Sequence, residues 1–344
     1  MTYGVFGNPQ YCLFLVLSIP QFGKREGVAI VERRILIGSC GGLTGSYLAR
    51  QFREIGCTVI GADSNEHNAA RPFLDEFAAL PGANAPDFCD RLLETLAGCR
   101  VDYYLPTHSK EIRAVAQQED RIRERWGGGF LVSPWETFAR LDNKRTANRC
   151  LQAAGIPVPR RVEEIGGAVG YPVFMKPDLG SGSSRAQVVE TENLHREYAR
   201  LYPDAGFYEY IKGTEYTVDC VFDAAGRMVA YNQRIRVKSM GGGVIISQND
   251  YGFDILPYLR KLEGAFLIKG CVNFQYILRD GVPYFTDINL RYASGGLPLT
   301  VASGIDVPRI LLALWENEPL PETASCGAAH KTMYRYFQEW YETV

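Results

Sequence analysis

The sequence predicts an α/β protein in two parts: an open domain with parallel strands, followed by a region of antiparallel hairpins. Two observations predict this. Residues 28–63 read as strand, glycine-rich turn, helix and strand, the order of a βαβ unit, whose parallel strands need a crossover helix. From residue 171 onward short apolar strands alternate with glycine-containing turns, and this pattern leads to a polar-faced hairpin at residues 273–296.

The composition favours a soluble chain with a small-molecule partner. The 344 residues are 46% hydrophobic and 22% charged, and they allow two or three subdomains. A net charge of −2 provides no basic field for nucleic acid. The nine cysteines are odd in number and never spaced C-x-x-C, which predicts reduced thiols in a cytoplasmic protein. The four histidines form no zinc motif.

Residues 1–27 are expected to form an N-terminal extension. Their apolar run, Tyr11 to Pro20, is too short for a helix that crosses a bilayer of about 30 Å, so no membrane association is expected. No Lys or Arg precedes Lys24, which argues against a signal peptide. The extension is open to three interpretations: an extra strand, an oligomer contact such as a homodimer interface, or an upstream start codon.

Residues 28–135 are predicted to form the open α/β domain. The turn GSCGGLTG follows strand 28–37 and precedes helix 46–56, and the next strand ends at Asp63. This pattern resembles a Rossmann-like dinucleotide-binding fingerprint, although Cys40 stands where G-x-G-x-x-G needs glycine. The other expected elements are helices at 88–98 and 109–125 and strands at 101–106 and 129–132.

Glu111 is a candidate substrate contact in this domain. It belongs to the loop PTHSKE, which follows a predicted strand at the edge where ligands bind in open α/β sheets. The alternative is a residue in the first turn of a helix, stabilised by the helix dipole.

The next helix is predicted over residues 142–155. Asp142 is the N-cap candidate and Gly155 ends the helix. Lys144 and Arg145 lie in the first turn, where a positive charge opposes the helix dipole. This placement predicts an anionic partner for one of them, with a solvated surface position as the alternative.

Residues 171–190 are predicted to form a hairpin with a flexible tip. Lys176 ends its first strand as a charge that reaches phosphates, and backbone N–H groups of the tip fold over them. The strand-to-helix P-loop is not favoured, because the G-K-[ST] ending is missing. The tip residues are Gly180, Ser181, Gly182, Ser183 and Ser184.

Residues 207–238 read as strand, turn at Lys212-Gly213, strand, turn and strand. Glu209 precedes Tyr210 and Ile211, whose backbone groups suit a purine edge, and Glu215 suits ribose hydroxyls. The following strand places three cations on one face, and like charges in a row cost stability unless an anion lies among them. They are Arg234, Arg236 and Lys238.

The hairpin at residues 273–296 turns at Asp280-Gly281. On its returning strand Asp287, Asn289 and Arg291 are spaced two apart, so we expect all three to project from one face. Oxygen ligands suit Mg²⁺, and a guanidinium suits phosphate. An ordinary solvated edge strand is the alternative for this stretch taken alone.

With these motifs in view, the chain resembles the ATP-grasp superfamily, in particular the carbamoyl-phosphate-synthase large-chain-like branch that includes the ligase of pyrrolysine biosynthesis. The resemblance covers about residues 28–315 and rests on six blocks in the expected order. It implies four regions. They are the extension 1–27, a Rossmann-like pre-ATP-grasp domain at 28–135, a small lid subdomain with its linker helix at 136–208, and a C-terminal subdomain at 209–344.

The resemblance also implies residue roles. Lys144 and Lys176 match the phosphate-contacting lysines, and the tip 180–184 matches the lid loop. Glu209, Tyr210 and Ile211 match the adenine-binding hinge, and Glu215 the ribose contact. Gln275, Asp287 and Asn289 match the ligands of two Mg²⁺ ions, with Mn²⁺ as an alternative ion. Arg291 matches the arginine that stabilises the transferred phosphoryl group. Asp287 stands where glutamate is common, and Leu290 where proline is usual.

The implied reaction is ATP-dependent formation of an amide from a small carboxylate and an amine, through an acylphosphate. Candidate holders of the substrate carboxylate are Arg234, Arg236, Ser294, Gly295 and Gly296. Three alternatives remain: an NAD(P)-dependent dehydrogenase that uses Asp63, a non-catalytic ATP-binding protein, and phosphorylation of bicarbonate or carbamate.

Overall fold

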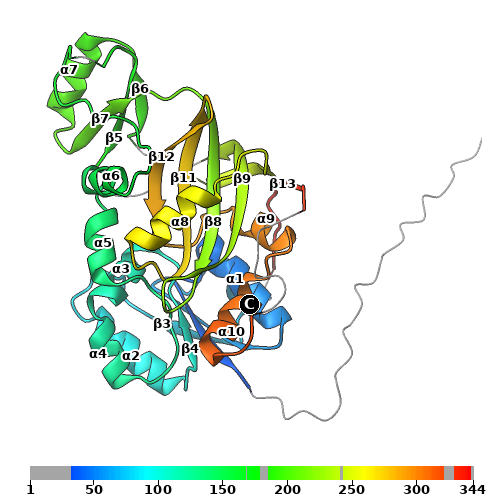
Figure 1. The fold of residues 1–344 in the computed structure, drawn as a ribbon. Helices are drawn as coiled ribbons and strands as arrows, with labels where there is room; N and C mark the ends of the chain where they lie inside the picture. The colour runs from blue at the N-terminus through cyan, green and yellow to red at the C-terminus, as the bar shows by residue number, and fades with distance from the viewer. Residues whose placement is uncertain (1–31, 168, 179–184, 241–242, 321–328, 342–344) are drawn as a thin grey trace, which may run out of the picture. The chain divides into compact units, whose positions relative to one another are not determined.

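The structure is a computed structural model that describes residues 32–167, 169–178, 185–240, 243–320 and 329–341. The chain divides into two units, residues 1–32 and 33–344, and the second is described here (Figure 1). The predicted extension 1–27 lies outside the described residues, and the division of 28–344 into three domains stays a prediction. No helix in the described ranges is long and apolar enough to cross a membrane.

The first sheet has four parallel strands in the order β3-β2-β1-β4, which confirms the predicted parallel α/β arrangement. The central strand β1 is apolar and buried on both faces, as a parallel strand between helices must be. The strands are β1 Arg34–Gly38, β2 Thr58–Asp63, β3 Glu76–Ala79 and β4 Tyr103–Leu105. The helices are α1 Leu43–Glu54, η1 Arg71–Phe73, α2 Phe88–Gly98, α3 Ser109–Gln117 and α4 Glu119–Arg125.

Three details of this region differ from prediction. Strand β3 was not expected, since it is short and only half-buried. The expected strand 129–132 is reduced to a single bridge between Gly129 and Tyr103. The expected helix 109–125 is broken at Gln118, where Glu119 and Asp120 supply acidic residues to the first turn of a new helix.

Two helices lead to the second sheet: α5 Trp135–Leu141 and α6 Lys144–Ala153. Asp142 was predicted as the N-cap of α6, and this is wrong. Asn143 is the N-cap, and its side-chain oxygen accepts from the backbone N–H of Thr146 at 3.1 Å. Asp142 pairs instead with Arg113, at 2.7 Å.

The second sheet has three antiparallel strands in the order β6-β5-β7. The strands are β5 Val173–Pro177, β6 Gln187–Val189 and β7 Ala205–Glu209. Helix α7, Glu192–Leu201, lies between β6 and β7 in the sequence. Strands β5 and β6 form the predicted hairpin. Its apolar side chains pack with α7 in a separate small core of Val173, Met175, Val189 and Phe207.

The third sheet has six antiparallel strands in the order β12-β11-β8-β9-β10-β13. They are β8 Thr214–Phe222, β9 Met228–Met240, β10 Gly243–Asn249, β11 Gly270–Arg279, β12 Val282–Asn289 and β13 Thr332–Tyr334. The helices of this region are α8 Leu256–Ala265, α9 Leu297–Ala302 and α10 Val307–Glu316. Helix α8 covers one face of this sheet (Figure 1), and its Leu259 and Leu262 share a core with Phe274 and Tyr276 of β11.

Two predicted turns have different outcomes. Asp280 and Gly281 both have positive φ, 51° and 75°, which gives the tight two-residue hairpin expected between β11 and β12. The turn at Lys212-Gly213 connects strands as expected, but β7 and β8 belong to different sheets. This segment is therefore a crossing between sheets, not a hairpin.

Candidate active site

The six-stranded sheet has a polar face opposite α8. Residues paired across neighbouring strands project from the same face. Asp287 pairs with Gln275, Gln275 with Thr217, and Thr217 with Arg234. A second row runs beside it through Asn289, Asn273, Asp219 and Asn232. The single polar row predicted on β12 is therefore the margin of a polar surface that crosses four strands.

The three predicted metal-binding residues meet at this margin. A β-bulge at Thr286 keeps Asp287 opposite Gln275 and returns Phe285 to the core face. The amide nitrogen of Asn289 donates to the side-chain oxygen of Asn273 at 3.2 Å, which leaves the Asn289 oxygen for another partner. Oxygen atoms from Gln275, Asp287 and Asn289 are the donors that a hard cation prefers, so the residues present fit Mg²⁺.

Two lysines from outside this sheet reach the same margin. Lys144, the first residue of α6, lies with its Nζ 3.7 Å from Oδ1 of Asp287. Lys176, on β5, donates from Nζ to the backbone oxygen of Thr286 and lies 5.1 Å from the ring centroid of Tyr208. The first turn of α6 was expected to have an anionic partner, and Asp287 is that partner for Lys144. The guanidinium of Arg145 instead lies 3.9 Å from the carboxylate of Glu163.

Burial changes the proton affinity of Lys176. Removal from water lowers the pKa of its amine to about 8, and the nearby charge of Asp287 opposes this shift. The adjacent charge of Lys144 lowers the pKa further. Two cations beside one carboxylate leave net positive charge here, which suits a polyanion such as a triphosphate.

Arg291 lies beyond the end of β12 and is largely buried. Burial lowers the pKa of its guanidinium, and the charge of Asp287 opposes this. It donates a hydrogen bond from Nη1 to the backbone oxygen of Tyr292, at 2.9 Å. Among the described residues it forms no ion pair, so its remaining donors are available to an anion.

His108, the N-cap residue of α3, lies close enough to Arg291 for the two charges to interact. Burial lowers the pKa of His108, and the charges of Lys110 and Arg291 lower it further. A second contact involves the same segment after β12: the hydroxyl of Thr44 in α1 donates to the backbone oxygen of Ala293 at 3.3 Å. The starts of α1 and α3 in the α/β region therefore lie near the segment that follows β12, residues 290–293.

The predicted lid, residues 180–184, lies outside the described residues, whereas Asp178 before it and Arg185 after it are described and form ion pairs. Asp178 accepts from Arg161 at 2.8 Å and from the hydroxyl of Tyr208 at 2.7 Å. On the other side of the tip, Arg185 pairs with Asp204 at 2.8 Å. These contacts join Asp178 and Arg185 to residues in or beside β7.

The hinge residues lie at the crossing between sheets. Glu209 pairs with Arg279 at 3.1 Å, and its backbone N–H donates to Arg160. Tyr210 is half-buried and Ile211 is buried. Glu215, predicted to contact ribose, is paired with Arg236 at 2.6 Å.

Two of the three cations predicted on one face of β9, Arg234 and Arg236, have protein carboxylates as partners. Arg234 is fully buried and binds Asp219 through two nitrogens, at 2.9 and 3.2 Å. Its expected partner was a substrate carboxylate, and the structure supplies a carboxylate from β8 instead. Arg236 binds Glu215 and also lies 3.3 Å from the side-chain oxygen of Gln275. Lys238 is exposed.

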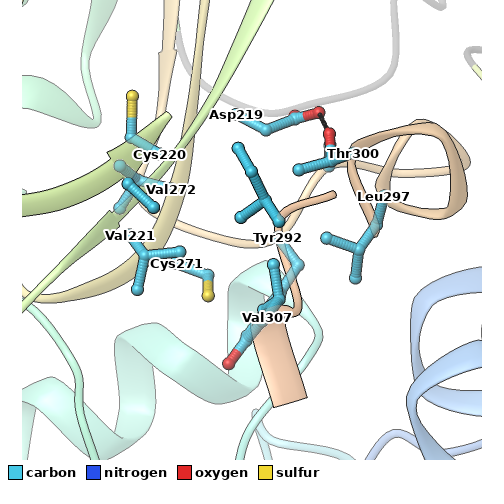
Figure 2. Close-up of a pocket in the computed structure, with 12 residues that line it drawn as sticks. Asp219, Cys220, Val221, Cys271, Val272, Tyr292, Leu297, Thr300 and Val307 are labelled. Atoms are coloured by element: carbon cyan, nitrogen blue, oxygen red, sulfur yellow. Dashed lines mark hydrogen bonds between the residues drawn. The ribbon is translucent and has the colours of Figure 1, made fainter. Parts of the chain in front are cut away.

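Asp219 is itself part of a buried network. Figure 2 shows Asp219 beside the hydroxyl of Thr300, which donates to it at 2.5 Å. Below this pair lies a cavity of about 10 Å³ lined largely by apolar side chains such as Val221, Cys271 and Leu297. This volume is close to the minimum for a single water, so the cavity is too small for a substrate.

Glu111 is buried at the carboxyl edge of the first sheet. It accepts from the hydroxyls of Tyr104 at 2.7 Å and Ser39 at 2.8 Å. Burial raises its pKa to about 7, and these hydrogen bonds oppose the shift. A Cβ on Gly38 would lie only 1.7 Å from its carboxylate. Glu111 therefore joins the loops after β1 and β4, and the structure supports the helix-first-turn alternative.

Asp63 is also occupied by the protein. Its carboxylate accepts from the backbone N–H of Gly41 at 3.0 Å and of Asn65 at 3.1 Å. These bonds stabilise the glycine-rich turn, whereas a dinucleotide site would need this carboxylate for ribose.

The substrate candidates Ser294, Gly295 and Gly296 form a turn beside two arginines. Gly295 has φ +84°, and its oxygen accepts from Arg335 at 3.0 Å. Gly296 packs on Arg234 so closely that a Cβ would lie 2.0 Å from the guanidinium. Ser294 is exposed.

Sequence reasoning did not identify Asp178, Arg335 or the backbone oxygen of Thr286. Asp178 lies two residues after Lys176, directly beyond the end of β5, a spacing that could have indicated its place at the base of the lid. Arg335 lies outside the motif blocks and is placed by strand pairing alone. A backbone oxygen gives no residue-type signal.

Comparison with known proteins finds similarity to the ATP-grasp superfamily, which the sequence motifs also resemble. Residues 203–338 match the family model described as ATP-grasp in the biosynthetic pathway with Ter operon. The chain is similar to the carbamoyl phosphate synthase large chain of Clostridium acetobutylicum, 27% identical over 57% of this chain. The match spans only 20% of the length of that relative.

Three solved structures share the fold. The N5-carboxyaminoimidazole synthetase of Staphylococcus aureus complexed with ADP aligns with a TM-score of 0.67 and 16% identity, over 85% of this chain and 79% of that one. The L-amino acid ligase of Bacillus licheniformis aligns with a TM-score of 0.64 and 15% identity, over 83% of this chain and 74% of that one. The biotin carboxylase of Campylobacter jejuni aligns with a TM-score of 0.62 and 18% identity, over 85% of this chain and 72% of that one.

Proposed function

We propose that this chain, which has the fold of the ATP-grasp ligases, joins a small carboxylate to an amine at the expense of ATP, releasing ADP and phosphate. The observation that supports this most directly is the approach of Lys144 and Lys176 to the Asp287 margin. Two sheets contribute to one cluster there, with net positive charge beside a set of oxygen ligands. A solvated edge strand gives no reason for two partly buried lysines at that place.

We assign nucleotide binding to the crossing between sheets. Glu209, Tyr210 and Ile211 are proposed to hold the adenine, and Glu215 the ribose. Because Glu215 is paired with Arg236, ribose binding would share or replace that contact. Lys144, Lys176 and the segment 180–184 are proposed to hold the phosphates.

The metal ligands are proposed to be Gln275, Asp287 and Asn289. Mg²⁺ bound there would neutralise phosphate charge and orient the γ-phosphate. With one carboxylate among three ligands, the site depends on phosphate oxygens to complete the coordination, which is the usual situation for Mg²⁺. We therefore expect metal to bind tightly only together with the nucleotide.

Phosphoryl transfer requires mainly positioning and charge neutralisation. The substrate carboxylate oxygen attacks the γ-phosphorus, the bond to the ADP oxygen breaks, and ADP leaves. Arg291 is proposed to stabilise charge on the transferred group, since no carboxylate in the described part of the chain uses its donors. The amine then attacks the acyl carbon of the acylphosphate and displaces phosphate, with loss of one proton from nitrogen. Exclusion of water by residues 180–184 would protect the acylphosphate.

The comparisons favour the ligase over the dehydrogenase alternative, and Asp63 is occupied by backbone N–H groups. The substrates themselves are a proposal of class only: a small carboxylate, including bicarbonate, and an amine. Domain boundaries at 135 and 208 are proposed on the motif order.

ADP release measured with Mg·ATP and a panel of carboxylates and amines tests this proposal. Asp287→Ala and Lys176→Ala should each lower the rate by roughly a hundredfold or more, because each removes a charge that faces the phosphates. Asp90→Ala and Lys261→Ala, at exposed positions elsewhere, serve as matched controls. Normal ADP release by the Asp287→Ala variant would refute the assigned site. ATP binding without release for any pair of substrates would instead favour a non-catalytic ATP-binding protein.

A further inference from the structure

Arg335 lies on the same sheet face as the proposed phosphate and metal residues. Strand β13 pairs with β10, where Met333 is opposite Ser247, and Ser247 is in turn opposite Arg236 of β9. Side chains alternate along a strand, so Arg335 projects from the face of Met333. The backbone N–H of Arg335 donates to Ile245 at 2.9 Å, which continues the pairing to this residue.

The Arg335 guanidinium is half-buried without a countercharge in the described part of the chain. It donates one hydrogen bond, to the backbone oxygen of Gly295 at 3.0 Å, and forms no ion pair with any described carboxylate. Removal from water lowers the pKa of the guanidinium, and among the described residues no neighbouring charge opposes this. A guanidinium has five N–H donors, so most of its capacity remains for a ligand.

Arg234 provides the contrast on the same face. It is also close to the 294–296 turn, but Asp219 neutralises it inside the protein. Two arginines therefore flank one turn, and only Arg234 has a described protein carboxylate. The turn begins three residues after Arg291, so Arg335 lies beside the segment that carries the proposed phosphoryl-stabilising arginine.

We propose that Arg335 binds a second carboxylate of the substrate pair, one that does not react. This rests on the proposed ligase function and specifies it: the group held near Gly295 belongs to an α-amino acid or a dicarboxylate, not to a simple amine. Guanidinium and carboxylate form a two-bond pair, and partial burial strengthens it. Gly295 has φ +84°, a backbone conformation that L side chains rarely adopt, which explains the glycine at this position beside the Arg335 guanidinium.

Direct binding tests the inference without turnover. The full chain with Mg·ADP would be titrated calorimetrically with the common L-amino acids and with succinate, glutarate and malate. Each compound that binds would then be compared with its primary amide. We expect the wild type to bind the carboxylate form at least tenfold more tightly than the amide.

In Arg335→Gln the affinity for the carboxylate form should fall by roughly tenfold to a hundredfold, while amide binding and ADP binding stay unchanged. Arg335→Lys should lie between the two, because it keeps the charge and loses the fork. Tyr334→Gln is the matched control, since Tyr334 is adjacent, 71% exposed and on the opposite face.

The outcomes separate this inference from the ligase proposal. Carboxylate binding that depends on Arg335 supports the subsite even where no ADP is released. Equal affinity of Arg335→Gln and wild type for the carboxylate form, or no binding of any tested carboxylate by the wild type, overturns it. ADP release with a simple amine, unaffected by Arg335→Gln, would uphold the ligase and reject the subsite.

Discussion

Lys176 is the residue at which the requirements of folding and of phosphate binding conflict most clearly. Its amine is buried next to Lys144, and burial lowers its pKa from 10.5 to about 8. The unfolded chain therefore binds more protons than the folded one between about pH 8 and 10.5. Stability rises with pH through that window, and the cost of burying the charged amine is fully present at pH 7.

We therefore expect Lys176→Met to be more stable than the wild type at pH 7, by roughly 1 kcal/mol or more, although it lacks activity. The difference should shrink as the pH rises from about 8 through 10.5, since only above 10.5 is the wild-type amine largely neutral in both states. Urea unfolding at pH 7 and pH 9 measures it, with Lys261→Met as the exposed control. A Lys176→Met variant less stable than the wild type at pH 7 would show that the contacts of Lys176 outweigh its burial cost.

At the scale of single elements, the start of helix α6 determines where Lys144 lies. The side chain of Asn143 accepts from the N–H of Thr146, and Lys144 is the first helical residue. Loss of an N-cap side chain typically costs about 1 kcal/mol. Lys144 would lose its orientation with the cap, so the effect extends to phosphate binding.

Asn143→Ala should lower the free energy of unfolding by about 1 kcal/mol and weaken Mg·ADP binding, whereas Asn143→Ser should restore most of both. Asp142→Ala is the matched control at the adjacent position. It removes only the partly exposed pair with Arg113 and should change stability by less than about 1 kcal/mol. Urea unfolding and calorimetric titration check these values. The reverse ranking, with Asp142→Ala the more damaging variant, would contradict the capping geometry.

The sequence predicted elements well where the signal is local. The hairpin turn at Asp280-Gly281 follows from two residues that tolerate positive φ, and the β5–β6 hairpin follows from its glycine-rich tip. Prediction from the sequence failed where a residue far away in the chain determines which partner a side chain binds. Asp142 and Asn143 are both good N-caps, and Arg113, 29 positions away, binds the first. The partner of Arg234 likewise depends on the register of β8 against β9, which no local pattern specifies.

At the scale of the molecule, the described contacts at the proposed site join two sheets. Lys144 and Lys176 approach the margin of the six-stranded sheet from the α6 and β5 side, at Asp287 and Thr286. These contacts include an ion pair at 3.7 Å, a hydrogen bond to a backbone oxygen, and the pair between Glu209 of β7 and Arg279 of β11 at 3.1 Å. Phosphates between the lysines and Asp287, with a cation, would replace a long ion pair by several charge-assisted bonds.

Mg·ADP should therefore stabilise both sheets together. At a free concentration about a hundredfold above the dissociation constant, the expected gain in unfolding free energy is about 2.7 kcal/mol. Hydrogen exchange should show slower exchange in β5 and β7 as well as in β11 and β12, because the ligand contacts residues of both sheets. Asp287→Ala should lose the effect in both sheets, while Asp90→Ala should retain it. Protection confined to the three-stranded sheet would mean that the nucleotide does not reach Asp287, and the division of roles between the lysines and the β12 margin would then be wrong.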